Sequence, residues 1–263
     1  MVHDFGRDGV SFGKDFLEAI IDGATIVARY PLTRWCFPTL NYPTALYATA
    51  KEMKGNLWLA YERSTALEER TSILEEICRL LQPLLDIVEE EVKLVGPQNV
   101  FIGGISAGCT AALHVFLSFQ SNRYSGSLGG FIGLGGMIPF PRDIQSLIRD
   151  TPLFRPSVHE IPQASLTLGL KVVNLIRASL NLPRLGKFDY SPSCLRSPML
   201  IGTTPNLRYN SELDAQWHTM IACLQRMGFL HPIWCNSDHD PDFASQMEGI
   251  IKFLEVAGCI KSD

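Results

Sequence analysis

One serine of this 263-residue chain stands in a turn that suits nucleophilic catalysis. The segment Gly104-Ile105-Ser106-Ala107-Gly108 fits the pattern G-x-S-x-G, between an apolar run and a helical pattern. In a strand–turn–helix of this kind the serine hydroxyl stands clear at the end of the sheet. The helix N-terminus and the backbone N–H of Ala107 favour the negative charge that develops on an attacked carbonyl oxygen. The sequence therefore predicts Ser106 as a nucleophile, the alternative being a glycine-rich turn with an incidental serine.

A serine hydroxyl is a weak nucleophile until a neighbouring base accepts its proton. Where a chain runs in the order serine, acid, histidine, the histidine follows the later strands of the sheet. His239 fits this place, because it lies between the apolar run Leu230–Cys235 and the helical pattern of Phe243–Val256. Four further histidines are better explained as core or surface residues: His114, His159, His218 and His231.

The acid expected between the serine and the histidine is missing. It should follow the strand predicted at Pro198–Gly202, but residues 203–209 include no carboxylate. Glu212 and Asp214 come next, within the helix predicted at Ser211–Met227. Because this acid orients the imidazole and stabilises its cation, we expect an impaired or altered catalytic group.

The elements that must position these residues alternate along the chain. Short apolar runs predict strands at Ala24–Tyr30, Arg34–Phe37, Asn99–Ile102, Gly130–Leu134, Pro198–Gly202 and Leu230–Cys235. Helical spacing marks Thr65–Leu94, Ser106–Phe119, Ser211–Met227 and Phe243–Val256, and Pro83 is expected to kink or divide the first. The alternation predicts an α/β fold with a mostly parallel sheet and helices on both faces.

Residues 141–192 differ from the rest of the single domain expected over 1–263. This segment has six prolines and one amphipathic helix at about Ala164–Leu180, between two core strands. We interpret it as an insertion that forms a lid or a wall of the substrate site, or else as a surface excursion without a role.

Composition excludes several classes of protein. Hydrophobic residues make up 46% of the chain, charged residues 19%, and the net charge of -4 does not suit a nucleic-acid partner. The seven cysteines are odd in number and contain no CxxC pair, which argues against a disulfide scaffold or a zinc cluster. No apolar stretch reaches the roughly 18 residues of a membrane span. The N-terminus has no secretory pattern, so we expect a cytoplasmic protein.

Four segments together resemble one family. Gly103–Cys109, GGISAGC, is similar to its GGISQGC, and Leu128–Pro139 is similar to its LGGFVGLSGWLP. Thr33–Thr39 is similar to its strand VRWVFPT, and His3–Gly6 falls where it has H-G-x-G. The chain thus resembles the phospholipase/carboxylesterase family of α/β-hydrolases, which includes acyl-protein thioesterases, and its fungal members in particular.

The resemblance implies an α/β-hydrolase fold with an oxyanion loop at His3, Asp4 and Gly6, and a first strand that is mostly absent. The backbone N–H of Phe5 would be a second oxyanion donor beside that of Ala107. Asp4 stands where the family has glycine.

The family also has an H-G-x-x-D loop that should begin near Gly202. A strict count places Pro205 at its aspartate, and Asn206, one residue later, is the nearest side chain able to hydrogen-bond an imidazole. Asp238 and Asp240, beside the histidine, are alternative sources of negative charge.

The implied activity is hydrolysis of a small-molecule carboxylic ester or acyl thioester. Ser106 would form an acyl-enzyme and His239 would transfer the proton, with no metal or organic cofactor. Some members of the family are dimers, so a homodimer is an alternative to a monomer. Because the acid is missing, two other functions stay open. One is non-hydrolytic chemistry, such as cyclisation, isomerisation or product release, in fungal specialised metabolism. The other is a degenerate binding protein.

Overall fold

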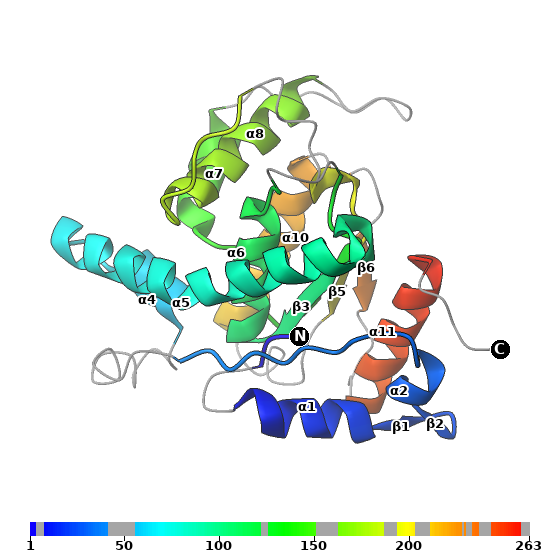
Figure 1. Ribbon diagram of the computed structural model, residues 1–263. Helices are drawn as coiled ribbons and strands as arrows, with labels where there is room; N and C mark the ends of the chain where they lie inside the picture. The colour runs from blue at the N-terminus through cyan, green and yellow to red at the C-terminus, as the bar shows by residue number, and fades with distance from the viewer. Residues whose placement is uncertain are drawn as a thin grey trace.

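The computed structural model describes residues 1–3, 8–41, 56–121, 126–150, 163–186, 194–202, 211–227, 229, 233–236 and 243–258. At the centre of this part lies a parallel sheet of four strands in the order β3-β4-β5-β6 (Figure 1). The strands are β3 (Phe101–Ile105), β4 (Gly130–Leu134), β5 (Met199–Gly202) and β6 (Ile233–Asn236). All residues of β4 and β5 are buried, as expected for parallel strands covered on both faces, so both appear in the sequence as continuous apolar runs.

The helices are α1 (Gly9–Glu18), α2 (Ile26–Arg29), α4 (Leu57–Arg63), α5 (Leu67–Val95), α6 (Ala107–Ser118), α7 (Pro141–Arg149), α8 (Gln163–Ala178), α10 (Ser211–Arg226) and α11 (Phe243–Val256). Short 3-10 turns occur at Pro97–Asn99 and Cys194–Arg196. The four long helices predicted from spacing are confirmed, and Pro83 lies inside α5 without dividing it.

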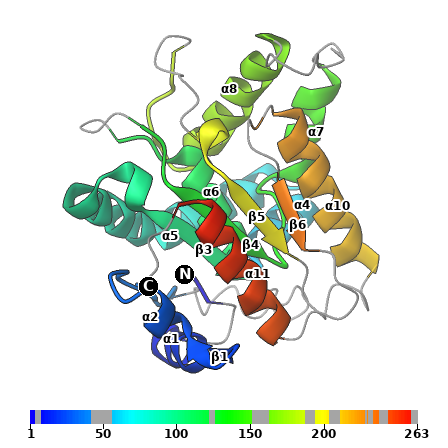
Figure 2. The ribbon, with the colours of Figure 1, turned by 90° about the vertical axis from the view of Figure 1, so that its right-hand side faces the viewer.

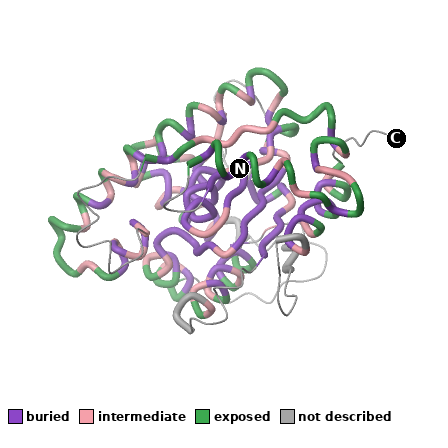
Figure 3. The backbone as a smooth tube through the Cα atoms, turned by 90° about the horizontal axis from the view of Figure 1, so that it is seen from below, coloured by how far each residue is buried: buried purple, intermediate pink, exposed green. Residues whose placement is uncertain are grey.

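The two faces of the sheet belong to two separate apolar clusters. Met199 and Ile201 of β5 face the larger cluster, which α4, α5, α6, α7, α8 and α10 complete. Leu200, between them, faces the smaller cluster with Phe16 of α1 and Ile250 of α11. Figure 2 shows α11 on one side of the strands, and in Figure 3 the buried segments gather at the centre of the molecule. The predicted fold, a parallel sheet between two layers of helices, is confirmed.

Val2 pairs in parallel with the edge of β3 that faces away from β4. Its N–H donates to the Gly103 carbonyl at 2.8 Å, and its carbonyl accepts from the Ile105 N–H at 3.1 Å. The backbone just before the predicted oxyanion loop is thereby fixed against the strand that leads to Ser106.

The strand predicted at Ala24–Tyr30 is wrong. Only Ala24–Thr25 is extended, as strand β2 of a small hairpin with β1 (Ile20–Ile21). Both turn residues, Asp22 and Gly23, have positive φ, which a two-residue hairpin of type I′ requires. The Thr25 side chain then accepts from the Ala28 N–H and starts α2, so a local cap prevails over the apolar run.

The strand predicted at Arg34–Phe37 is also wrong, because these residues pair with no strand. The nearby edge of β3 carries Val2 instead. The rings of Trp35 and Phe37 pack against Phe16 of α1, with ring centroids 5.4 and 5.5 Å away. Their apolar side chains therefore pack against the smaller cluster, and the segment is not a strand of the sheet.

The described part of residues 141–192 holds two helices where the sequence predicted one. The predicted helix is α8, whose buried residues Val172 and Ile176 pack in the larger cluster with α6. The other is α7, which packs against α8 and α10. Pro141 occupies its first turn, a position where proline costs no hydrogen bond. These helices belong to the core layer, and the role of the segment as a lid stays a prediction.

Two further features concern the described residues as a group. The cysteines at 36, 78, 109, 194 and 223 are free thiols. No helix in the described ranges is both long and apolar enough to cross a membrane.

A chain of directed hydrogen bonds crosses the larger cluster through His114. The Trp58 indole N–H donates to His114 Nδ1 at 3.0 Å, and an indole can only donate. His114 Nε2 therefore carries the ring proton and donates to Ser179 Oγ at 2.9 Å, and Ser179 Oγ donates to the Ile176 carbonyl at 2.7 Å. Burial lowers the pKa of His114 to about 3. The neutral ring joins α4, α6 and the end of α8.

This arrangement predicts a pH-dependent stability. An unfolded His114 binds a proton below about pH 6.5, whereas the folded one stays neutral down to about 3. The stabilisation from the neutral ring is therefore complete above about pH 6.5 and falls as the pH is lowered, by roughly 2 kcal/mol at about pH 5. We expect His114→Gln to lower the free energy of unfolding at neutral pH, and the gap to the parent chain to narrow toward about pH 5. Urea unfolding across this pH range measures it. His218→Gln, at an exposed position of α10, is the control, and a gap independent of pH would contradict the prediction.

Candidate active site

Ser106 lies in a strained turn between β3 and α6. Its backbone has φ 53° and ψ −120°, which is uncommon for a residue other than glycine and is found at sites held by their surroundings. Its N–H donates to the Leu134 carbonyl of β4 at 2.7 Å. Its carbonyl accepts from the N–H groups of Cys109 and Thr110 at 3.0 and 3.2 Å. The backbone of this half-buried residue is therefore held from the sheet and from α6, and its side chain does not cap the helix.

Glycines make the turn sterically feasible. A Cβ on Gly104 would lie 2.3 Å from the Gly108 carbonyl oxygen, too close for any side chain. A Cβ on Gly108 would lie 2.2 Å from the His3 carbonyl oxygen and 2.5 Å from that of Val2. Thus β3, the first turn of α6 and the N-terminal segment meet backbone to backbone around Ser106. Both glycines of the G-x-S-x-G pattern therefore leave space that no side chain could share.

His3 is completely buried beside this turn. Its Nε2 accepts from the Leu40 N–H at 3.1 Å, so the neutral ring carries its proton on Nδ1. The imidazole thereby ties the start of the predicted oxyanion loop to the segment before residue 42. The rest of that loop, Asp4, Phe5 and Gly6, lies outside the described residues. Ala107, the other predicted oxyanion donor, is the buried first residue of α6.

Asn206, with the other candidates for the acid, and His239 lie outside the described residues, but the strands before them are placed. Gly202 ends β5 and pairs with Leu134 of β4, and Asn236 ends β6 and pairs with Gly202. Since all four strands are parallel, the loops after β5 and β6 begin at the carboxyl ends of the strands, which is also where Ser106 follows β3. The topology thus agrees with a serine, acid and histidine site, and the roles of the individual residues stay predictions.

The loop after β4 borders the serine turn. The Met137 N–H donates to Thr110 Oγ1 in the first turn of α6 at 3.1 Å. At the end of the loop, buried Phe140 has the left-handed backbone values φ 53° and ψ 53°. Its ring meets that of Tyr61 edge-on, with centroids 4.9 Å apart. The loop is therefore held at Met137 by a contact with α6 and at Phe140 by a contact with α4. The sequence analysis used residues up to Pro139 for the family resemblance but gave no role to Phe140, whose bulk before Pro141 was the available signal.

Cys109, three residues after Ser106, is the thiol nearest to it in sequence. It is fully buried, with Sγ 2.4 Å from where a Cβ on Gly136 would lie. Burial raises the pKa of the Cys109 thiol to about 12, so it stays protonated near neutral pH and is a poor nucleophile.

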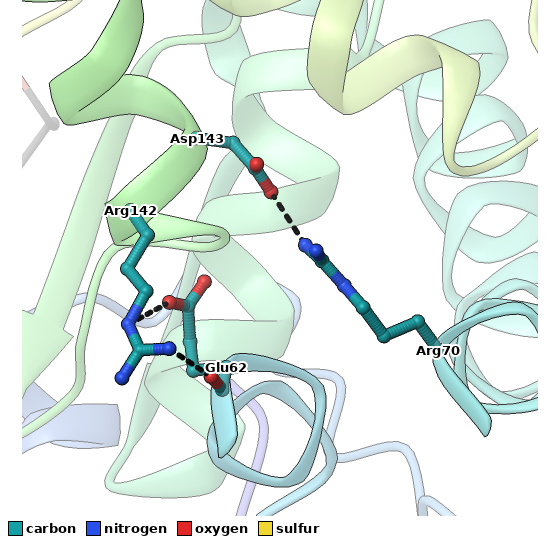
Figure 4. Close-up of polar contacts among 4 residues, drawn as sticks. All are labelled: Glu62, Arg70, Arg142 and Asp143. Carbon is teal, nitrogen blue, oxygen red and sulfur yellow. Dashed lines mark hydrogen bonds and ion pairs between the residues drawn. The ribbon is translucent and has the colours of Figure 1, made fainter. Parts of the chain in front are cut away.

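Away from the serine turn, four charged residues form a polar group between α4, α5 and α7 (Figure 4). Arg142 donates through Nη1 to the Glu62 carbonyl at 2.7 Å, and its Nε lies 3.5 Å from Glu62 Oε2. Arg70 Nη2 lies 3.3 Å from Asp143 Oδ2. Burial, and then the charge of Asp143, raises the pKa of Glu62. Since each acid pairs with an arginine of another helix, the group links α7 to α4 and α5. Sequence reasoning missed it, because its members are far apart along the chain.

Groups of three or more His, Cys, Asp and Glu placed to hold a metal ion do not occur within the described ranges.

Comparison with known proteins agrees with this geometry. The sequence matches the model of the Phospholipase/Carboxylesterase family over residues 7–197, which include the serine turn but not His3, Asn206 or His239. A search of the curated proteins finds no significant match.

Among solved structures, a substituted form of Arabidopsis thaliana SOBER1 matches with a TM-score of 0.53 and 13% identity, over 97% of both chains. A second substituted form of SOBER1 has a TM-score of 0.49 and 13% identity, over 97% of this chain and 96% of that one. Prolyl oligopeptidase B of Galerina marginata has a TM-score of 0.36 and 15% identity, over 70% of this chain and 25% of that one.

The match to the family model extends over most of the chain and contains β3, the serine turn, α6 and β4. The likeness to the first SOBER1 form supports the fold alone, because so few residues are identical. A hydrolase of the esterase type is what the family and the parallel sheet together indicate. The chain belongs to the phospholipase/carboxylesterase family of α/β-hydrolases.

Proposed function

We propose that this protein is a serine hydrolase that cleaves a carboxylic ester or an acyl thioester through an acyl-enzyme on Ser106. The observation that carries the proposal is the strained backbone of Ser106, held by bonds to β4 and α6. Such a conformation costs of order 1–3 kcal/mol, and the surrounding contacts have to maintain it. The turn presents a hydroxyl at the end of the sheet, which a nucleophile requires.

The proposed reaction has two halves. Ser106 Oγ attacks the acyl carbonyl carbon while His239 accepts the hydroxyl proton. The backbone N–H groups of Ala107 and Phe5 stabilise the resulting oxyanion. Collapse breaks the bond to the alkoxide or thiolate leaving group, which takes the proton from His239. Water then attacks the acyl-enzyme by the same route and releases a carboxylic acid and free Ser106. Every step uses groups of the chain, so neither a metal nor an organic cofactor is needed.

The missing acid favours a second candidate function, namely non-hydrolytic chemistry on the same acyl-enzyme. Replacing the acid of a serine protease by Asn lowers kcat about 10⁴-fold, because the imidazole is then held in the wrong tautomer. A site with Asn206 near this place would deacylate slowly, which suits a reaction in which something other than water receives the acyl group. The two candidates share the acyl-enzyme on Ser106, and the ratio of hydrolysis product to other products separates them.

Removing the Ser106 hydroxyl should abolish covalent chemistry at the turn. We expect a fluorophosphonate probe to label the parent chain at one serine, and Ser106→Ala to lose the label together with hydrolysis of p-nitrophenyl acetate and an octanoyl thioester. Ser72→Ala, on the exposed face of α5, is the matched control and should keep both. Folded parent protein that stays unlabelled, or a variant that keeps its label, would refute the acyl-enzyme.

Restoring a carboxylate should raise the rate of hydrolysis. If Asn206 stands beside the distant nitrogen of His239, Asn206→Asp would orient the ring and stabilise its cation, and we expect kcat to rise at least tenfold, about 1.4 kcal/mol. Pro205→Asp is the matched variant, and it should exceed Asn206→Asp only if the strict count from Gly202 is right. Steady-state kinetics with p-nitrophenyl acetate measure both. If neither variant exceeds the parent chain, the acid belongs at neither position.

A further inference from the structure

A cavity lies at the end of α6 that is distant from the serine turn. It has a volume of about 390 Å³, within the usual range for ligand pockets, and lies between α5, the end of α6 and the segment after α8. Of the helices around it, α6 packs against both α5 and α8. Ser106 precedes the first residue of α6, whereas Ser118 at its last residue lines the cavity. At about 1.5 Å per helical residue, the cavity is roughly 17 Å from the serine turn and is a separate site.

One wall of the cavity presents a buried arginine. Arg177 of α8 is 6% exposed, and burial lowers the pKa of its guanidinium. Its Nε donates to the Pro183 carbonyl at 2.8 Å and its Nη1 donates to the Ser118 carbonyl at 2.5 Å. Both acceptors are neutral, and no described acid forms an ion pair with Arg177. Through the second bond Arg177 caps the last carbonyl group of α6, where the helix dipole favours a cation. Its charge still has no carboxylate partner, and its Nη2 has no acceptor, among the described residues. A buried cation of this kind favours an anionic partner.

The opposite wall carries negative charge. Asp86 and Glu89 are one turn apart on α5, so both project from one side of that helix toward the cavity. Asp86 accepts from Gln82 at 3.0 Å, and Glu89 has no ion pair with a described residue. Neither acid forms an ion pair with Arg177.

Apolar residues also line the cavity. Leu85 of α5 is buried there, and Leu182 and Phe119 are half-buried. Arg184, at the exposed rim, adds a second positive charge near the segment after α8. A ligand that satisfies all three parts needs one anionic group, one cationic group and an apolar body.

We propose that this cavity binds a small zwitterion, namely a free amino acid with an apolar side chain. Its carboxylate accepts from Arg177 Nη2, and its ammonium group lies toward Glu89 and Asp86. Its side chain rests on Leu85, Phe119 and Leu182. The site is independent of the chemistry proposed for Ser106.

Three probes of nearly equal shape test the proposal by calorimetric titration of the full chain. L-phenylalanine carries both charges, 3-phenylpropionate lacks the ammonium group, and 2-phenylethylamine lacks the carboxylate. We expect phenylalanine to bind at least tenfold more tightly than either. Equal affinities for phenylalanine and 3-phenylpropionate, or no binding of phenylalanine at millimolar concentration, would overturn the proposal.

Variants of the acidic wall make the test sharper without disturbing the bonds of Arg177. Glu89→Gln should weaken phenylalanine binding about tenfold and leave 3-phenylpropionate unaffected. Glu90→Gln, at the next and exposed position of α5, is the matched control and should change neither. Arg177→Lys should weaken the binding of both probes that carry a carboxylate, phenylalanine and 3-phenylpropionate. A thermal melt shows whether this variant is folded. A Glu89→Gln chain that binds phenylalanine like the parent would contradict the proposed orientation.

Discussion

Backbone crowding around Ser106 is the constraint on which the rest of the site depends. The strand β3, the first turn of α6 and the segment Val2–His3 approach so closely that a Cβ at Gly104 or Gly108 would overlap a carbonyl group. The approach forces Ser106 into a positive φ, and the hydrogen bond from its N–H to Leu134 keeps it there. Because the same contacts fix Val2 and His3, the turn at Ser106 and the start of the predicted oxyanion loop are held by one set of close contacts. Changes to either glycine would therefore reach beyond the turn itself.

Buried polar groups are satisfied differently in the middle of α6 and at its C-terminal end. Near its middle, His114 is neutral and has a partner at each ring nitrogen, so burial costs it no unmade hydrogen bond. At its end, Arg177 is also buried but is bonded only to carbonyl groups. The first arrangement is complete in itself and joins helices of the core. The second leaves a charge beside a cavity, which is why we infer a ligand there and not at His114.

The helices α7 and α8 show how a segment between two core strands can belong to the core. Val172 and Ile176 are buried with α6, and the ion pairs of Arg142 and Asp143 link α7 to α4 and α5. Pro141 lies in the first turn of α7. A high proline content is therefore compatible with regular, packed structure, because proline fits the first turn of a helix without loss of a hydrogen bond.

Local patterns in the sequence were sufficient to predict the serine turn and most strands of the sheet. The G-x-S-x-G spacing, the apolar runs at β4 and β5 and the periodicity of α5 each depend on near neighbours, so they survive without knowledge of the fold. The runs at Ala24–Tyr30 and Arg34–Phe37 were misread, because a threonine cap and the occupation of the β3 edge by Val2 decided their structure. Burial alone does not distinguish a strand from an extended segment packed on a helix. Contacts such as Arg142 with Glu62, or the two walls of the Arg177 cavity, join residues distant along the chain. Only the tertiary structure could decide these, since charge compensation and cavities depend on which helices pack together and not on the spacing within any one of them.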